Sequence, residues 1–115
     1  MRSRRIPLAL ALRLGAALAL LLAGAACSTE VGDECTSDAE CGEGRICDRA
    51  SHAGYCTVSP CGPNSCPANS VCARLANDLT YCMALCESNE DCREGYTCTE
   101  DTAAPVPYCR QSNRH

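Results

Sequence analysis

The sequence predicts a small disulfide-rich fold: three tandem four-cysteine units, each a short β-hairpin with irregular loops, preceded by a helical signal peptide. Three observations support this prediction. The chain of 115 residues contains 13 cysteines but neither phenylalanine nor tryptophan. All of the cysteines follow residue 26, and twelve of them recur at nearly constant spacing. The residues before them are basic and then apolar, which is typical of an export signal.

Residues 1–26 are predicted to be a lipoprotein-type signal peptide. Three arginines stand near the start, and an uninterrupted apolar run occupies residues 14–26. This run suits the hydrophobic part of a signal peptide, since a membrane-spanning helix needs about 20 apolar residues. An uncleaved anchor over residues 6–26 is the alternative. It is less favoured because Arg13 would lie in hydrocarbon, at a cost of about 2.5–3.5 kcal/mol.

Cys27 ends the apolar run and is the predicted lipidation site. The segment LLAGAAC resembles the lipobox of bacterial lipoproteins: Ala25 and Ala26 match it, and Gly24 stands where an aliphatic residue is usual. The resemblance implies a lipid on Cys27, the membrane as a partner through that lipid, and a place in the cell envelope, at the outer membrane or cell surface. The alternative is ordinary cleavage after Ala25, which would give a secreted protein whose Cys27 pairs with a second molecule.

The part of the chain after residue 26 is too poor in apolar residues for an ordinary core. It contains eight Leu, Ile and Val residues, whereas ordering each residue costs on the order of 1.5 kcal/mol. Disulfides must therefore supply much of the stability, and they require an oxidising compartment. This part is also acidic, with six arginines against fourteen Asp and Glu residues, which argues against nucleic acid as a partner.

Twelve cysteines define three units of four. In every unit the fourth cysteine follows a tyrosine and the third follows a β-branched residue, as in a tandem repeat. The predicted divisions are a short tether (27–34), unit 1 (35–56), unit 2 (61–82), unit 3 (86–109) and a tail (110–115). The predicted disulfide cysteines are Cys35, Cys41, Cys47, Cys56, Cys61, Cys66, Cys72, Cys82, Cys86, Cys92, Cys98 and Cys109.

Each unit is expected to contain one antiparallel hairpin, with its third and fourth cysteines on the two strands. The loops between these strands, 48–54, 73–80 and 99–107, differ in sequence, and variable loops on a rigid frame are where binding is expected. Four cysteines allow three pairings. We expect first-to-third and second-to-fourth pairing, because bridges between neighbours would close small loops and leave the hairpin untethered.

No catalytic site is recognisable, so we expect a protein that is not an enzyme and has no cofactor. The two histidines, His52 and His115, lie in a variable loop and at the terminus, where no Ser-His-Asp or Cys-His constellation can be placed. Cys-x2-Cys pairs typical of zinc sites are missing, so no metal site is predicted. Calcium is a minor alternative, because hard cations bind carboxylates. Two acidic clusters could supply them: Asp33, Glu34, Asp38, Glu40 and Glu43, and Glu87, Glu90, Asp91 and Glu94.

Short segments of the units resemble known extracellular modules. CTSDAECGEGRIC in unit 1 and CESNEDCREGYTC in unit 3 resemble the Cys-x2-Asp-x2-Cys-x5-Cys stretch of the Dickkopf N-terminal domain and the whey acidic protein core. CGPNSCPANSVC in unit 2 is similar to the opening of an EGF-like module. The chain thus looks like a bacterial cysteine-rich lipoprotein with tandem modules, and the resemblance implies binding of an extracellular protein partner.

Three functions remain open from the sequence. A surface-displayed interaction module is favoured by the lipobox, the tandem units and the divergent loops. A secreted protease inhibitor is the second, in which Arg49 or Arg74 would lie in an extended loop presented to a trypsin-like protease. The third is a passive envelope or spacer protein without a specific ligand.

Overall fold

The computed structural model describes residues 29–112. The predicted signal peptide and Cys27 lie outside the described residues. Within residues 29–112 there is no helix with the length and hydropathy that a membrane crossing requires.

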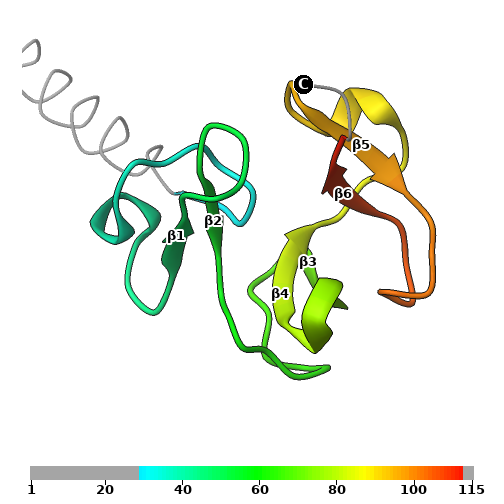
Figure 1. Ribbon diagram of the computed structural model, residues 1–115, viewed down its shortest axis with the longest axis horizontal. Helices are drawn as coiled ribbons and strands as arrows, with labels where there is room; N and C mark the ends of the chain where they lie inside the picture. Colours follow the sequence, from blue (N-terminus) through cyan, green and yellow to red (C-terminus); the bar gives the residue numbers. More distant parts are fainter. Residues whose placement is uncertain (1–28, 113–115) are drawn as a thin grey trace, which may run out of the picture.

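Three two-stranded antiparallel sheets make up the fold, one in each unit (Figure 1). The strands are β1 (Ile46–Asp48), β2 (Tyr55–Thr57), β3 (Ser70–Arg74), β4 (Thr80–Ala84), β5 (Tyr96–Thr99) and β6 (Tyr108–Gln111), and three short 3-10 helices are η1 (Asp38–Cys41), η2 (Ala76–Asp78) and η3 (Asn89–Asp91). The third and fourth cysteines of each unit face each other across its hairpin, in the pairs Cys47–Cys56, Cys72–Cys82 and Cys98–Cys109. The prediction of one hairpin per unit is confirmed.

Six disulfides pin an irregular N-terminal segment across each hairpin. The pairing is first-to-third and second-to-fourth in all three units, as expected. The bridges are Cys35–Cys47, Cys41–Cys56, Cys61–Cys72, Cys66–Cys82, Cys86–Cys98 and Cys92–Cys109. Each strand of every hairpin thus carries one bridge to the segment before it, which holds the hairpin without a large apolar core.

Strand β4 lies at the centre of the molecule and joins the units. The amide of Cys82 donates to the carbonyl of Val58 at 3.0 Å, and the Thr57 hydroxyl donates to the carbonyl of Cys82 at 2.7 Å, so the end of unit 1 runs beside β4. Just beyond β4, Leu85 forms an isolated antiparallel bridge with Tyr108 of β6. The three hairpins are therefore fused into one body and do not form a string of separate modules.

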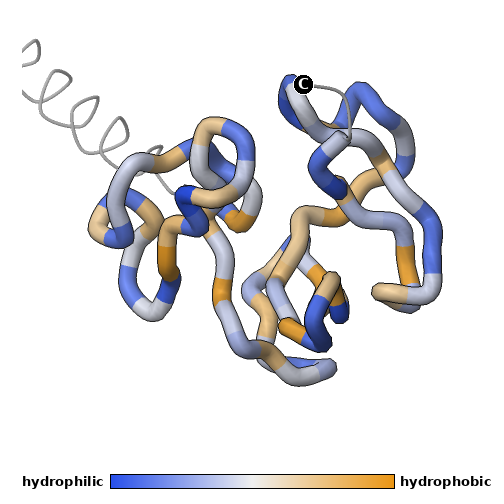
Figure 2. The backbone as a smooth tube through the Cα atoms, viewed as in Figure 1, coloured by the Kyte–Doolittle hydropathy of each residue, from blue (hydrophilic) through white to orange (hydrophobic). Residues whose placement is uncertain are grey.

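The main core lies where the units meet. Its buried side chains include Tyr55 from unit 1, Met83 just after unit 2 and Tyr108 from unit 3. A second cluster consists only of the four cysteines of unit 1. Apolar stretches along the chain are short and scattered (Figure 2), which is why tyrosine and cysteine, and not a continuous aliphatic layer, fill the interior.

The segment before unit 1 belongs to the folded body from Thr29 onward. The Thr29 hydroxyl donates to the carbonyl of Glu40 at 3.1 Å, and the guanidinium of Arg45 donates to the carbonyl of Thr29. Val31 is buried, and the amide of Gly32 donates to the carbonyl of Cys56 at 2.9 Å. Most of the predicted tether is thus packed on unit 1.

Candidate functional site

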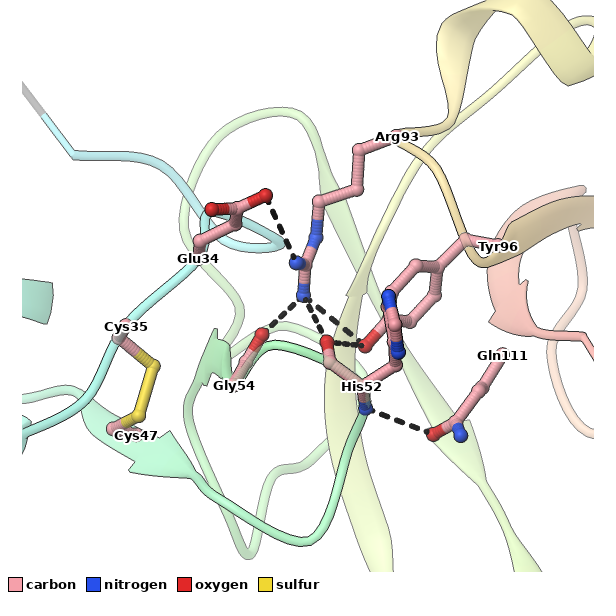
Figure 3. Close-up of polar contacts among 8 residues, drawn as sticks. All are labelled: Glu34, Cys35, Cys47, His52, Gly54, Arg93, Tyr96 and Gln111. Atoms are coloured by element: carbon pink, nitrogen blue, oxygen red, sulfur yellow. Dashed lines mark hydrogen bonds and ion pairs between the residues drawn. A yellow bond between two sulfur atoms is a disulfide. The ribbon is translucent and has the colours of Figure 1, made fainter. Parts of the chain in front are cut away.

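The variable loop of unit 1 packs against unit 3. The amide of His52 donates to Oε1 of Gln111 at 3.3 Å, and its carbonyl accepts from the Tyr96 hydroxyl at 3.0 Å (Figure 3). Its ring lies on Gly95, where an added Cβ would come 2.6 Å from His52 Cδ2. The contacts of His52 therefore position a loop, and its main chain supplies most of them.

Arg93 of unit 3 fills the junction between units 1 and 3. Its Nη2 donates to the carbonyls of His52 and Gly54, and Nη1 lies 3.8 Å from Oε1 of Glu34 (Figure 3). The guanidinium carbon is 4.5 Å from the ring centroid of Tyr96 and 5.6 Å from that of Tyr55, within the range of cation–π attraction. With 20% of its side chain exposed, Arg93 is mostly withdrawn from solvent.

Gly54, whose carbonyl accepts from Arg93, lies tightly against the backbone of Cys35. Its φ is +72°, and a Cβ here would collide with the carbonyl of Cys35, so only glycine fits. Tyr55 follows it directly, and its hydroxyl accepts a hydrogen bond from the amide of Ala84 at 2.8 Å. Burial raises the pKa of Tyr55 to about 12, although the Ala84 bond and the charge of Arg93 act in the opposite direction. All three units therefore meet within a few residues.

The variable loop of unit 3 packs against unit 2. The amide of Arg74 donates to the carbonyl of Ala103 at 2.8 Å. Within the loop, the Asp101 carboxylate accepts from the amide of Ala103 at 2.9 Å and from the hydroxyl of Tyr108 at 3.0 Å. These bonds, the Ala103 amide first, hold the pKa of Asp101 below its usual value. A second variable loop is thus used for contacts between units.

The loop of unit 2 differs, because the polar contacts of its tip stay within its own hairpin. The amide of Leu75 donates to the carbonyl of Leu79 at 2.8 Å, and the guanidinium of Arg74 lies 3.8 Å from Oδ1 of Asp78. Asn77 and Asp78 have φ of 64° and 60°, the pattern of a tight hairpin turn. Leu79 is 52% exposed. Of the three variable loops, this is the one whose tip makes no polar contact with another unit within the described residues, although Leu75 packs against the main core.

Neither candidate arginine of the inhibitor hypothesis lies in a free extended segment. Arg49 stands in a turn in which the Asp48 carboxylate accepts from the amide of Ala50 at 3.1 Å. Arg74 pairs with Thr80 across the β3–β4 hairpin, and its amide is bound to Ala103. A substrate-like inhibitor needs a pre-organised extended backbone that can pair with the protease. The geometry therefore gives this hypothesis less support than the interaction module.

The acidic clusters organise the backbone of units 1 and 3. Asp38 accepts from the amide of Cys47 at 2.8 Å, and Asn89, at the same position of unit 3, accepts from the amide of Cys98 at 3.0 Å. In each of these units a carboxylate two residues further along the chain accepts hydrogen bonds from residues just before the 3-10 helix. Glu40 accepts from the hydroxyl and the amide of Thr36, and the bond from the hydroxyl is the main cause of its lowered pKa. Asp91 accepts from the amides of Glu87 and Ser88, which lower its pKa.

These roles leave the carboxylates dispersed. Within residues 29–112, the groups of three potential metal ligands with atoms within 4.8 Å of one another are all cysteine groups, one per unit. Their sulfurs belong to the six disulfides. The twelve predicted disulfide cysteines are thus brought together in pairs, whereas the predicted calcium candidates are not brought to a common point.

The sequence reasoning missed Arg93 and Tyr96, which form the junction. A signal was present: units 1 and 3 are nearly aligned in CGEGRIC and CREGYTC, and these two residues replace Gly42 and Arg45 of unit 1. Departures from an internal repeat thus mark the contacts between units.

Comparisons with protein-family models, curated proteins and solved structures found no match to this chain.

Proposed function

We propose that this chain is a membrane-anchored, surface-exposed cysteine-rich lipoprotein that acts as a protein-interaction module. The anchor is the lipid expected on Cys27, and the protein resides in the cell envelope. Its body of three fused units is held by six disulfides, which suits an oxidising location outside the cytoplasm.

One observation supports binding of a partner over a passive role. Eight Leu, Ile and Val residues follow residue 26. Four of them are large exposed hydrophobics: Ile46 (39%), Leu79 (52%), Leu85 (41%) and Val106 (43%). Single exposed aliphatic side chains are common on protein surfaces. A protein so short of apolar residues nevertheless loses hydrophobic stabilisation by leaving half of these eight side chains 39–52% exposed, and a partner that covers them would recover this energy.

The interaction is tested by removing these four side chains together. A variant with Ile46, Leu79, Leu85 and Val106 changed to Gln is compared with a control in which the exposed alanines Ala39, Ala50, Ala68 and Ala76 are changed to Gln. A peroxidase fused to the C-terminus labels neighbouring proteins on intact cells. We expect the first variant to lose specific neighbours and the control to keep them. Identical labelling of both variants and the unaltered protein would favour a passive spacer.

The anchor is tested separately by the intact mass of the protein from its own membranes. We expect a chain that begins at Cys27 and carries acyl groups, with twelve cysteines that react with an alkylating reagent only after reduction. In Cys27→Ser the acyl mass and the membrane association are expected to disappear. A soluble unacylated product from the unaltered gene would exclude the lipid anchor and leave a secreted interaction module.

A further inference from the structure

A groove crosses the connection between units 2 and 3. A shallow, open cavity of about 480 Å³ is lined by Leu85, Glu87 and Asp91 together with Val106 and Pro107. A smaller cavity of about 200 Å³ shares Leu85 and Asp91 with it and continues toward the segment 30–33. We call these two cavities together the junction groove. It therefore runs from unit 3 to the start of unit 1.

Two of the four exposed aliphatic residues lie in the junction groove. Leu85 is 41% exposed and Val106 is 43% exposed. The backbone of Leu85 is held in place, since Leu85 is bridged to Tyr108 and its amide donates to the carbonyl of Asn69 at 3.0 Å. An apolar surface that is already fixed binds a partner without a large cost in ordering.

The rim of the junction groove is negatively charged. Four exposed carboxylates line it: Glu30, Asp33, Glu87 and Asp91. Arg93 also contacts the smaller cavity, but its guanidinium is bound to the carbonyls of His52 and Gly54 and paired with Glu34. The electrostatic potential over the junction groove is therefore set by the four carboxylates of the rim, and this negative potential attracts cationic groups.

We propose that the junction groove binds a short segment of a partner protein in which lysine or arginine side chains flank an aliphatic one. This inference rests on the proposed function and specifies its partner. The aliphatic side chain packs between Leu85 and Val106, and the cationic groups lie over the carboxylates of the rim. Such charge complementarity at an interface determines specificity and the rate of association. A small cation is a poorer fit, because no three carboxylates converge within the described residues.

The first test uses an unbiased library of random dodecapeptides panned against the oxidised full-length chain in detergent micelles. We expect enriched peptides that combine basic and aliphatic residues, with affinities that fall as ionic strength rises. An enriched peptide is then synthesised and joined to the protein with a carbodiimide, which links carboxylates to lysines. Because the chain contains no lysine, side-chain cross-links within it cannot form, and the expected products join peptide lysines to Glu30 or Glu87.

Two pairs of matched variants locate the binding. The first pair tests the charge of the rim. The double variant Glu30→Gln/Glu87→Gln is compared with the control Glu43→Gln/Glu100→Gln, which removes the same charge from exposed positions outside the groove. The second pair tests the apolar contact, and it compares the double variant Leu85→Gln/Val106→Gln with the control Ile46→Gln/Leu79→Gln. We expect each groove variant to weaken peptide binding by about tenfold or more, and each control by less than about twofold. Retention of six disulfides and a dispersed amide spectrum confirm that every variant is folded.

Three results would overturn the proposal: no enrichment, enrichment of acidic or neutral peptides, or binding that the groove variants leave unchanged. The proposed function has its own test, since labelling of neighbours on cells depends on all four exposed aliphatic residues. Loss of labelling through Ile46 and Leu79 alone would keep the interaction module and move its site away from the junction groove.

Discussion

The rings of Tyr55 and Tyr96 lie 5.2 Å apart between centroids at an angle of 36°, although they belong to the first and the third unit. The guanidinium of Arg93 lies within cation–π range of both rings. Aromatic pairs in such tilted arrangements contribute about 0.5–1.5 kcal/mol beyond the area they bury. The contact therefore closes the chain on itself and makes the stability of unit 1 depend on unit 3.

Replacing Arg93 with Met is expected to lower the free energy of unfolding by about 2–4 kcal/mol. The substitution removes hydrogen bonds from a charged donor to the carbonyls of His52 and Gly54, together with the contact with Tyr96. Chemical denaturation with all disulfides intact measures the loss. Arg74→Met is the control, because the Arg74 side chain is 66% exposed, and its cost is expected to stay below about 0.5 kcal/mol. Equal costs would contradict a special role of Arg93.

Alkaline pH is expected to destabilise the fold through Tyr55. Burial raises its pKa from 10.0 to about 12, so the folded state holds the phenol proton more tightly than the unfolded state does. This contribution is fully present below about pH 10 and is lost as the pH rises through about 12. Burial also raises the pKa of Tyr96 and of Tyr108, so a rapid pH jump followed by phenolate absorbance is expected to show Tyr55 as the last tyrosine to ionise, a component that Tyr55→Phe removes. Ionisation of all tyrosines near pH 10 in the folded protein would exclude this effect.

Insertions in the variable loops are expected to have unequal costs. A Gly-Ser insertion between Asn77 and Asp78 lengthens a loop whose polar contacts stay in its own hairpin, so we expect a loss below about 1 kcal/mol. The same insertion between Ser51 and His52 moves the His52 carbonyl away from Arg93 and Tyr96, and we expect a loss above about 2 kcal/mol. Thermal unfolding compares the two variants. A larger loss at the unit 2 tip would show that this loop is packed in solution.

The two disulfides of unit 2 are expected to differ in importance. Cys61–Cys72 and Cys66–Cys82 span 11 and 16 residues, so chain entropy alone gives each bridge about 3 kcal/mol. Cys82, however, is fully buried and its backbone joins β4 to unit 1. Double Ala variants are therefore expected to lose more stability when Cys66–Cys82 is removed. Hydrogen exchange is expected to show faster opening in all three units for that variant alone. Equal losses confined to unit 2 would mean that the units unfold independently.

The hairpins and the disulfide pairing could be predicted because they depend on local order. The third and fourth cysteines are close in sequence, and β-branched residues and tyrosine beside them favour strands. The arrangement of the units could not be predicted in this way. It depends on contacts such as Tyr55 with Ala84 and Arg93 with Gly54, which join residues far apart in the chain and leave no periodic pattern.

The divergent loops illustrate the same limit. From the sequence, variation suggests surfaces that recognise different ligands. In the structure, two of these loops differ because each fits a different neighbouring unit, through His52 on unit 3 and through Ala103 on unit 2. In the junction groove, by contrast, Leu85 and Val106 are far apart in the sequence, and they come together only when unit 3 and the residue before it fold.

The hydrogen bonds of Thr29 with Glu40 and Arg45 limit the distance between the folded body and a bilayer in which Cys27 is anchored. An extended chain spans at most about 3.6 Å per residue, so a lipid on Cys27, two residues earlier, would lie within about 7 Å of a fixed point on the body. With such an anchor the protein would have no stalk, and unit 1, which holds Thr29, would lie next to the headgroups. The protein would then bind only partners that are embedded in the membrane or lie at its surface.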